Sequence, residues 1–317
     1  MKHFIKPLSA LLLATTIITG CNTEISPQAP RAVYHWKTTF DADSFTQELI
    51  KKQKIGRIYL RMFDVDTEYD IEKGTYVAVP IATTRFETPI PQNVEMIPVT
   101  YITLNALKAM IGNETEYAEL LTERLLAMCS YNECGKIKEV QIDCDWTQST
   151  KGSYSKLCQN IKDRLNDKEI ELSITVRLHQ LKETPPSADK GVLMLYNTGT
   201  LKNFNTKNSI LDLNDVRPYI KKCDYPIPLA YAYPTFGWGV KFDKEENFVA
   251  IVGENTTDTL AGEHIRRERP TAEEILEVKK LVESKLGKPE NGNIIYHLDK
   301  TQLKNYTNDE INQILSL

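Results

Sequence analysis

Asp143 and Asp145 are the side chains in this sequence best suited to do chemistry. They belong to the stretch 138–147, which alternates between apolar and polar residues as a half-buried strand does. The apolar side carries Val140, Ile142 and Cys144, and the polar side carries Gln141, Asp143 and Asp145. An edge strand with two solvated aspartates would give the same pattern. We favour a strand whose polar side faces a site, because strand interiors are depleted in Asp and burying carboxylates is costly.

Two carboxylates among aromatic side chains are what the cleavage of a glycosidic bond requires. One carboxylic acid protonates the leaving oxygen, and a second group stabilises or attacks the anomeric carbon. Asp143 and Asp145 share one strand face, so their Cα atoms should lie about 6.5–7 Å apart. This spacing does not distinguish retaining from inverting geometry. The less solvated of the two would have the higher pKa and the acid role, and both are our candidate catalytic residues.

Further polar and aromatic side chains fall at or near the ends of predicted strands, where they would surround this pair. The candidates for substrate binding are Gln141, Arg61, Arg177, Tyr196, Asn197, Tyr233, Trp238 and His297. Three of them have a second interpretation. Arg177 would equally serve as a structural ion-pair partner of Asp143 or Asp145. His297 would equally be a satisfied polar residue where a loop begins, and Trp238 would pack a hairpin on the barrel rim.

The chain around these residues alternates strands and helices, which predicts the α/β class and a single (β/α)8 barrel domain over residues 32–317. The predicted strands are 32–36, 57–64, 95–103, 138–147, 171–179, 191–197, 226–234 and 293–298, and the predicted helices are 45–54, 116–128, 154–165, 209–222, 271–286 and 308–317. A long insertion, 65–94, follows the second strand. A β-hairpin, 236–242 with 248–252, follows the seventh. Active sites of such barrels lie at the C-terminal ends of the strands, so the candidates would meet at one mouth.

Length and charge agree with this fold and exclude some functions. The 317 residues suffice for one barrel and its extensions. The formal net charge of −4 gives no basic excess for a nucleic-acid partner. No Gly-rich phosphate loop follows any strand, and the cysteine spacing does not resemble a metal site. The sequence therefore predicts no cofactor and no metal.

The first 20 residues have the pattern of a leader. Lys2 and Lys6 precede an apolar run, 8–18, that is too short to span a bilayer. Ile18-Thr19-Gly20-Cys21 resembles a bacterial lipobox, which implies cleavage before Cys21 and acylation of that cysteine. The alternative is an ordinary secretory leader with a chance cysteine. Residues 21–31 are predicted to be a flexible tether.

The lipobox resemblance implies a place in the cell. It predicts a protein of the cell envelope that is attached to a membrane through lipid on Cys21. By analogy, Asn22 favours the outer membrane where the cell has one.

Five further cysteines allow two disulfides. Cys129 and Cys134 flank a short polar loop and could bridge in an oxidising compartment. Cys144 and Cys158 could form a second pair, or be two buried small apolar residues, which we favour. Cys223 would remain free.

Two strands resemble motifs of one enzyme family. Ile142-Asp143-Cys144-Asp145-Trp146 is similar to the fourth-strand signature D-G-x-D-x-D-W-E of chitinase-like family 18 glycoside hydrolases, and 193–197, Leu-Met-Leu-Tyr-Asn, is similar to their M-x-Y-D. The resemblance implies that Asp145 supports the acetamido group of the substrate and that Tyr196 lines the same subsite. The family's catalytic glutamate falls on Thr147, which cannot protonate a glycosidic oxygen.

A wider resemblance, covering most of the chain after Cys21, is to an uncharacterised group of bacterial barrel lipoproteins. It rests on 140–147, 173–175, 194–199, 225–229 and 236–238, and it implies the fold and the lipid anchor but no activity. Two functions therefore remain open. The barrel either acts on a glycan of the cell envelope, or it has lost catalysis and binds a glycan or serves as a structural envelope lipoprotein.

Overall fold

The computed structural model describes residues 29–222 and 224–317. The predicted leader, Cys21, the tether as far as residue 28, and Cys223 lie outside the described residues. The described chain enters beside Gly292, where an added Cβ would lie 3.1 Å from the carbonyl oxygen of Pro30. Gly292 directly precedes the last barrel strand, so the chain enters at the N-terminal ends of the strands, opposite the mouth.

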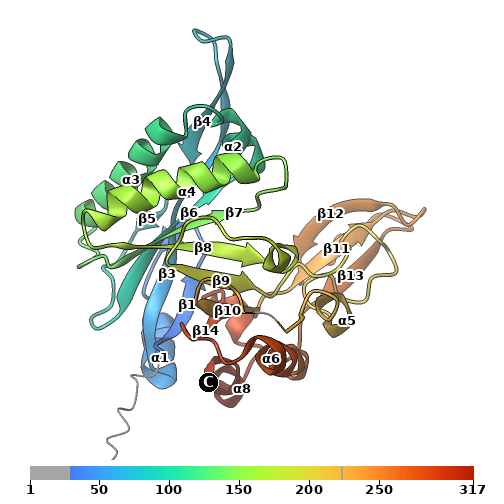
Figure 1. Ribbon diagram of the computed structural model, residues 1–317. Helices are drawn as coiled ribbons and strands as arrows, with labels where there is room; N and C mark the ends of the chain where they lie inside the picture. The colour runs from blue at the N-terminus through green and yellow to red at the C-terminus, as the bar shows by residue number, and fades with distance from the viewer. Residues whose placement is uncertain (1–28, 223) are drawn as a thin grey trace, which may run out of the picture.

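Eight parallel strands close into a barrel (Figure 1). β1 (Arg31–His35) pairs with both β14 (Asn293–Tyr296) and β3 (Ile55–Asp70), which closes the ring. The other five barrel strands are β6 (Glu95–Ile102), β7 (Glu139–Cys144), β8 (Glu171–Arg177), β9 (Lys190–Met194) and β10 (Leu229–Pro234). The predicted (β/α)8 barrel is confirmed.

Helices cover the outer face of most of the barrel. They are α1 (Ser44–Gln53), α2 (Leu104–Ala109), α3 (Glu114–Tyr131), α4 (Lys151–Asn166), α6 (Ala272–Leu286), α7 (Lys300–Leu303) and α8 (Asn308–Leu315). Thr271 and Thr307 begin α6 and α8 with capping boxes, in which a hydroxyl and a glutamate satisfy free backbone amides.

The predicted helix 209–222 is wrong. The structure has one short α-helical turn in that range, α5 (Leu213–Val216). A separate 3₁₀ turn, η1 (Leu178–Lys182), follows β8. The side chain of Asn208 accepts hydrogen bonds from the amides of Ile210 and Leu211, which favours a turn over a helix. Pro218 has no amide hydrogen to donate and would interrupt a helix. The segment between β9 and β10 is therefore mostly loop.

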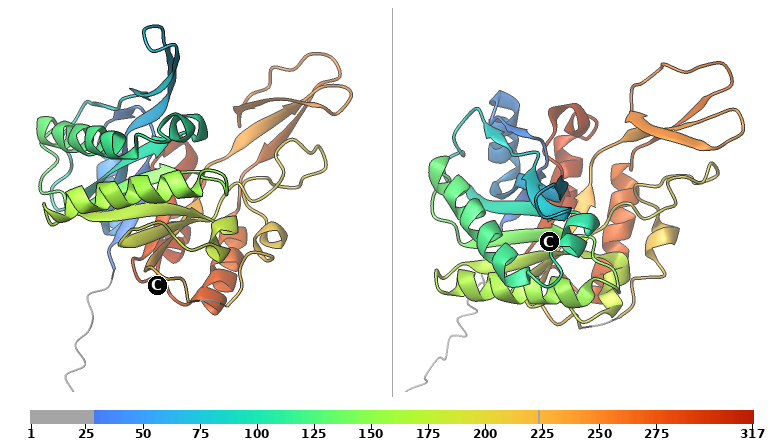
Figure 2. Two further views of the ribbon diagram at one scale, coloured as in Figure 1. Left: turned by 45° about the horizontal axis from the view of Figure 1, so that its top comes forward. Right: turned by 90° about the horizontal axis from the view of Figure 1, so that it is seen from above.

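The insertion after the second barrel strand is a projecting hairpin. β3 runs 16 residues, and its second half pairs antiparallel with β4 (Thr75–Ile81). A short pair, β2 (Thr39–Phe40) with β5 (Arg85–Phe86), lies beside it. The insertion after the seventh strand is a sheet of β11 (Trp238–Phe242), β12 (Phe248–Gly253) and β13 (His264–Glu268). Its third strand was not predicted. Figure 2 shows the hairpin and this insertion sheet as separate projections.

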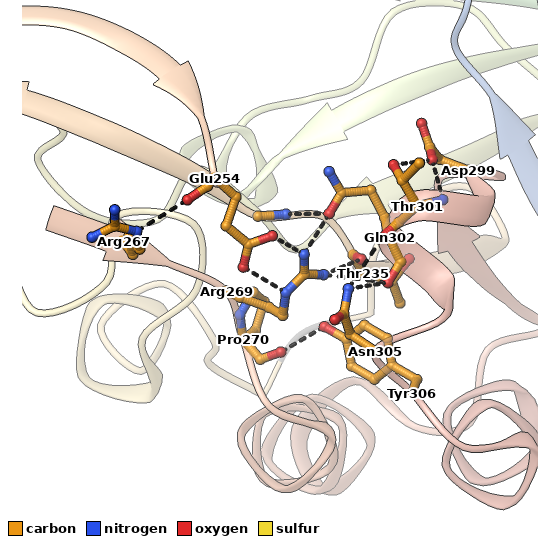
Figure 3. A network of polar contacts seen from close by, with 11 residues as sticks. Thr235, Glu254, Arg267, Arg269, Pro270, Asp299, Thr301, Gln302, Asn305 and Tyr306 are labelled. Atoms are coloured by element: carbon orange, nitrogen blue, oxygen red, sulfur yellow. Dashed lines mark hydrogen bonds and ion pairs between the residues drawn. The ribbon is translucent and has the colours of Figure 1, made fainter. Parts of the chain in front are cut away.

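A polar network holds the insertion sheet on the barrel (Figure 3). Arg269 follows β13 and donates to Glu254 Oε1 at 2.8 Å and to Gln302 Oε1 at 2.7 Å. The amide of Gly237 donates to the same glutamine oxygen at 3.1 Å. Gly237 has no room for a side chain, because a Cβ would lie 2.7 Å from the carbonyl oxygen of Glu268. The sheet is thus fixed to the segment that follows β14.

Polar side chains fill much of the barrel interior. At the closed end, Tyr59 donates to Glu139, which also pairs with Lys190 at 3.4 Å. One layer higher, Tyr34 donates to Gln141 Oε1 at 2.6 Å. Burying these polar groups is costly, and the hydrogen bonds and the ion pair between them offset that cost.

The four cysteines of the described part are buried free thiols. Neither suggested disulfide, Cys129–Cys134 or Cys144–Cys158, is formed. Cys144 and Cys158 pack in the layer between β7 and α4, as two small apolar residues would.

Candidate functional site

Asp143 lies inside the mouth of the barrel, near the end of β7. Its side chain is 3% exposed, and its Oδ1 accepts a hydrogen bond from Thr175 Oγ1 of β8 at 2.6 Å. Burial raises the pKa of Asp143, Arg177 opposes this, and the nearby Asp145 raises it further. The carboxyl is therefore held in place and sheltered from solvent.

Arg177, at the end of β8, joins the two aspartates. Its Nη2 lies 3.2 Å from Asp143 Oδ1, and its Nε pairs with Asp145 Oδ1. Its guanidinium also lies over the ring of Tyr196, 5.6 Å from the centroid. Burial alone would lower the pKa of Arg177, but Asp143, Tyr196 and Asp145 outweigh it and hold the pKa well above its ordinary value. Arg177 is therefore charged at any ordinary pH.

The two aspartates differ in access. The side chain of Asp145 is 50% exposed, so a ligand can reach it, whereas Asp143 is enclosed. Tyr101 of β6 lies next to both. Burial and the nearby charges of Asp145 and Asp143 raise the pKa of Tyr101 to about 12. Its phenol therefore stays protonated and can donate a hydrogen bond.

A pocket of about 240 Å³ opens beside this ion pair. Four predicted site residues line it: Asp145, Arg177, Tyr196 and Asn197. Leu178, His179, Met194, Thr198 and Tyr219 complete the lining. Thr198 and Tyr219 were not identified from the sequence, because both fall in the loop that was partly predicted as helix. The pocket has the size for one small ring with hydrogen-bonding groups.

A second ion pair stands at the mouth, on β3. Arg61 Nε donates to Asp64 Oδ1 at 2.6 Å, and Arg61 Nη1 donates to the carbonyl of Trp36 at 3.1 Å. A register shift between Arg61 and Phe63 places Arg61 and Asp64 on the same side of the strand. Asp64 is not among the candidate residues named from the sequence.

Aromatic rings form a row from the mouth toward the insertion sheet. Successive ring centroids lie 5.6 Å apart from Trp36 to Tyr296, 4.6 Å to Tyr196, 5.9 Å to Phe236 and 5.3 Å to Trp238. Trp238 also donates from its indole nitrogen to the buried Glu268 at 2.9 Å. The row gives the mouth an apolar floor beside its charged pairs.

Two predicted substrate-binding residues lie where no ligand can reach them. Gln141 is fully buried and donates to Ser173 Oγ below the aspartates, so it belongs to the barrel interior. Tyr233 is fully buried and points toward the helix layer. Burial raises the pKa of its phenol, and Glu283 of α6 raises it further. Neither side chain lines the pocket beside Arg177.

His297 does not line the pocket. It lies beside Tyr296, with ring centroids 5.4 Å apart, and interacts with the buried His35. Burial lowers the pKa of each histidine to about 4. Both are neutral at ordinary pH.

Thr147 occupies the position of the missing glutamate. Its side chain is exposed, its amide donates to Thr150 Oγ1 at 3.0 Å, and its hydroxyl bonds with Ser149 at 3.0 Å. The residue belongs to the turn that begins α4. Within residues 29–222 and 224–317, no three His, Cys, Asp or Glu side chains gather to hold a metal ion. No helix of the described part is long and apolar enough to cross a membrane.

Comparison with known proteins places the fold. No protein-family model matches the sequence, and no curated protein matches it at a significant level. Solved structures of similar fold include a GH18 chitinase of Flavobacterium johnsoniae, with TM-score 0.56 and 12% identity over 92% of this chain and 94% of that chain. A chitinase of Chromobacterium violaceum gives TM-score 0.53 and 12% identity over 91% and 99% of the two chains.

A chitinase-like agglutinin of Robinia pseudoacacia gives TM-score 0.54 and 12% identity over 90% and 99% of the two chains. The chain therefore has the fold of the GH18 chitinase-like barrels. At this level of identity the likeness concerns the fold alone.

Proposed function

We propose that the barrel mouth binds a glycan without cleaving it. The observation that carries this proposal is the pairing of the carboxylates at the mouth. Asp143 and Asp145 share Arg177, and Asp64 is held by Arg61. A general acid must reach the glycosidic oxygen and give up a proton. Asp143 is enclosed, Asp145 is paired with Arg177, and Thr147 has no proton of suitable acidity.

The same groups suit recognition. The exposed part of Asp145 and the amide of Asn197 offer hydrogen bonds to sugar hydroxyls in the 240 Å³ pocket. Tyr196 is largely buried by Arg177 and Tyr296, but part of it lines the pocket and offers an apolar contact to the C–H groups of a sugar. Fold neighbours of both kinds support this class of ligand, since some are named chitinases and one is named a chitinase-like agglutinin.

One observation favours hydrolysis as the second candidate. Burial raises the pKa of Asp143, and a carboxyl with a raised pKa next to an ionised one is the usual arrangement of glycosidase acids. It would require Arg177 to release Asp143 when a ligand binds. The experiment below separates the two functions.

The experiment measures binding and cleavage on the same purified protein. Chitin oligosaccharides and a panel of envelope glycans are titrated calorimetrically, and product release is followed by mass spectrometry. We expect binding without products, and a loss of affinity of about tenfold or more for Tyr196→Ala. Tyr131→Ala, an exposed tyrosine on α3 far from the mouth, is the matched control. Cleavage that Asp145→Asn abolishes would establish the enzyme instead.

The proposal includes a lipid anchor. The lipobox-like 18–21 supports acylation of Cys21, and the described chain enters the barrel at the end opposite the mouth. An anchored protein would then present the mouth away from the membrane, toward polymers of the envelope. Metabolic labelling with a fatty-acid analogue tests this, and a label that Cys21→Ala does not remove would contradict it.

A further inference from the structure

A second hollow lies on the projecting hairpin, apart from the mouth. Its volume is about 530 Å³, and it is lined by Thr67, Thr75, Tyr76, Asn105, Lys108 and Ala109. We call this set the hairpin hollow. It forms where β4 packs beside α2, as Figure 1 shows. Side chains alternate along β3, so Thr67 lies on the face opposite Asp64 and Asp66, and the hollow is separate from the glycan site proposed above.

A pair of tyrosines gives the hollow an ordered aromatic side. Tyr69 and Tyr76 are direct cross-strand partners in the hairpin, and their rings meet edge to face with centroids 5.3 Å apart. Tyr76 nevertheless remains 62% exposed, so much of its ring is open. The cross-strand contact stabilises the hairpin and fixes the orientation of both rings. The open part of the Tyr76 ring can still contact a ligand.

The polar side chains that line the hollow are open to a ligand. In the described part of the chain, the side-chain polar groups of Thr67, Thr75, Asn105 and Lys108 make no hydrogen bond or ion pair. Lys108 is the one charged group among the lining residues, and no carboxylate lines the hollow. An ammonium group without a counter-ion, next to hydroxyls and an amide, favours an anionic ligand rich in hydroxyl groups.

The hairpin is held firmly at its base, so these groups keep their arrangement. Thr103 Oγ1 donates to Asp66 Oδ1 at 2.8 Å, and the amide of Ala78 donates to Tyr117 Oη at 3.3 Å. These two contacts tie both strands of the hairpin to the helices α2 and α3. A site fixed in this way loses little conformational entropy when a ligand binds.

We propose that the hairpin hollow binds an acidic sugar of a glycan. The C–H face of the ring stacks on Tyr76, the carboxylate of the sugar pairs with Lys108, and the hydroxyls bond to Thr67 and Asn105. An acidic peptide would use the same ammonium group. The hydroxyl-rich lining around a single ring face suits a sugar better, since the remaining apolar lining is Ala109 alone.

The test uses matched charged and neutral sugars. The full chain is titrated calorimetrically with tetragalacturonate, with its methyl ester, and with a glutamate tetrapeptide. We expect tetragalacturonate to bind at least tenfold more tightly than either of the others. Tyr76→Ala should lower that affinity about tenfold, and Lys108→Gln should abolish the preference for the acid over the ester. Tyr131→Ala is the control, because Tyr131 is 87% exposed on α3 and lies outside the hollow.

Three results would overturn the proposal. The first is no measurable binding of tetragalacturonate. The second is binding that neither Tyr76→Ala nor Lys108→Gln weakens. The third is equal binding of the glutamate peptide, which would make the hollow a site for acidic peptides. A mouth variant, Tyr196→Ala, keeps the two sites distinguishable, because it should leave tetragalacturonate binding unchanged.

Discussion

Arg177 Nη2 lies 3.2 Å from the buried Oδ1 of Asp143, and this contact compensates a carboxylate that the barrel otherwise shields from water. Both groups are held in place by others, Asp143 by Thr175 and Arg177 by Asp145. The mouth is therefore arranged before any ligand arrives. A site that is arranged in advance loses little conformational entropy when a ligand binds.

Arg177→Met should destabilise the fold strongly, by about 3–5 kcal/mol, because it leaves the carboxyl of Asp143 buried without its partner. The measurement is the free energy of unfolding from urea denaturation at neutral pH. Asp145→Asn should cost less than about 1 kcal/mol, since the side chain of Asp145 is half exposed.

The double variant Arg177→Met with Asp143→Asn supplies the control. Removing both charges leaves no uncompensated ion, so most of the lost stability should return. A double variant no more stable than Arg177→Met alone would show that Arg177 stabilises the fold through packing on Tyr196 and not through Asp143.

The sequence predicted the barrel well, because strand alternation is local. The polar side of 138–147 faces inward as its pattern indicates. Tyr233 shows the limit of such reasoning. Tyr231 and Tyr233 alternate with Ala230 and Ala232, and either side of the strand could face the barrel. In the structure the tyrosines take the helix side, where Tyr231 donates to the carbonyl of Gly287. Tyr34 of β1 and Tyr59 of β3 already fill the interior. These strands are far from β10 in the sequence, so the alternation within β10 does not reveal which of its sides faces inward.

The mouth was predicted only in part, for a related reason. Arg61 was identified, but its partner Asp64 was not placed beside it, since residues three apart in a regular strand lie on opposite faces. The register shift in β3 changes that relation. Tyr219 was missed because it lies within 209–222, which was predicted to be a helix. Side-chain hydrogen bonds of Asn208 determined the loop instead.

Stability should fall as the pH is lowered from about 6.5 to about 4, partly through His35 and His297. Burial lowers the pKa of each from 6.5 to about 4, so the unfolded chain binds protons in this window and the folded chain does not. Their stabilising contribution is full above about 6.5 and is lost as the pH falls through the folded value. Unfolding free energies measured at several pH values test this.

The matched variants are His35→Phe and His179→Asn. In His35→Phe, the free energy of unfolding should fall less between pH 6.5 and pH 4 than it does in the wild type. Each protein is compared with its own value at pH 7. His179→Asn should not have this effect, because His179 is exposed at the edge of the pocket. Identical pH profiles for His35→Phe and the wild type would exclude His35 as a source of the effect.

Cys144 and Cys158 should resist thiol reagents in the folded protein. Both are fully buried, and burial raises the pKa of Cys158 to about 12 and that of Cys144 well above its usual value. The reactive species is the thiolate, so modification should await unfolding. Peptide mapping after brief exposure to iodoacetamide gives the extent at each cysteine, with protein in denaturant as the fully reactive reference. Rapid native modification at Cys158 would mean that α4 opens readily from β7.

Arg269→Met should loosen the insertion sheet without unfolding the barrel. The substitution leaves Glu254 without the guanidinium that pairs with it and frees Gln302 from the same contact. We expect a cost of about 1–3 kcal/mol, from the unpaired groups, and faster hydrogen exchange at the amides of β11, while β7 and β8 stay protected.

Arg267→Met is the control. Arg267 lies on β13, two residues before Arg269, and is exposed; within the described residues its side chain donates to the carbonyls of Glu254 and Thr256. Its substitution should change stability by less than about 0.5 kcal/mol. Equal acceleration in the two variants would mean that the hydrogen bonds between the strands, and not Arg269, hold the sheet in place.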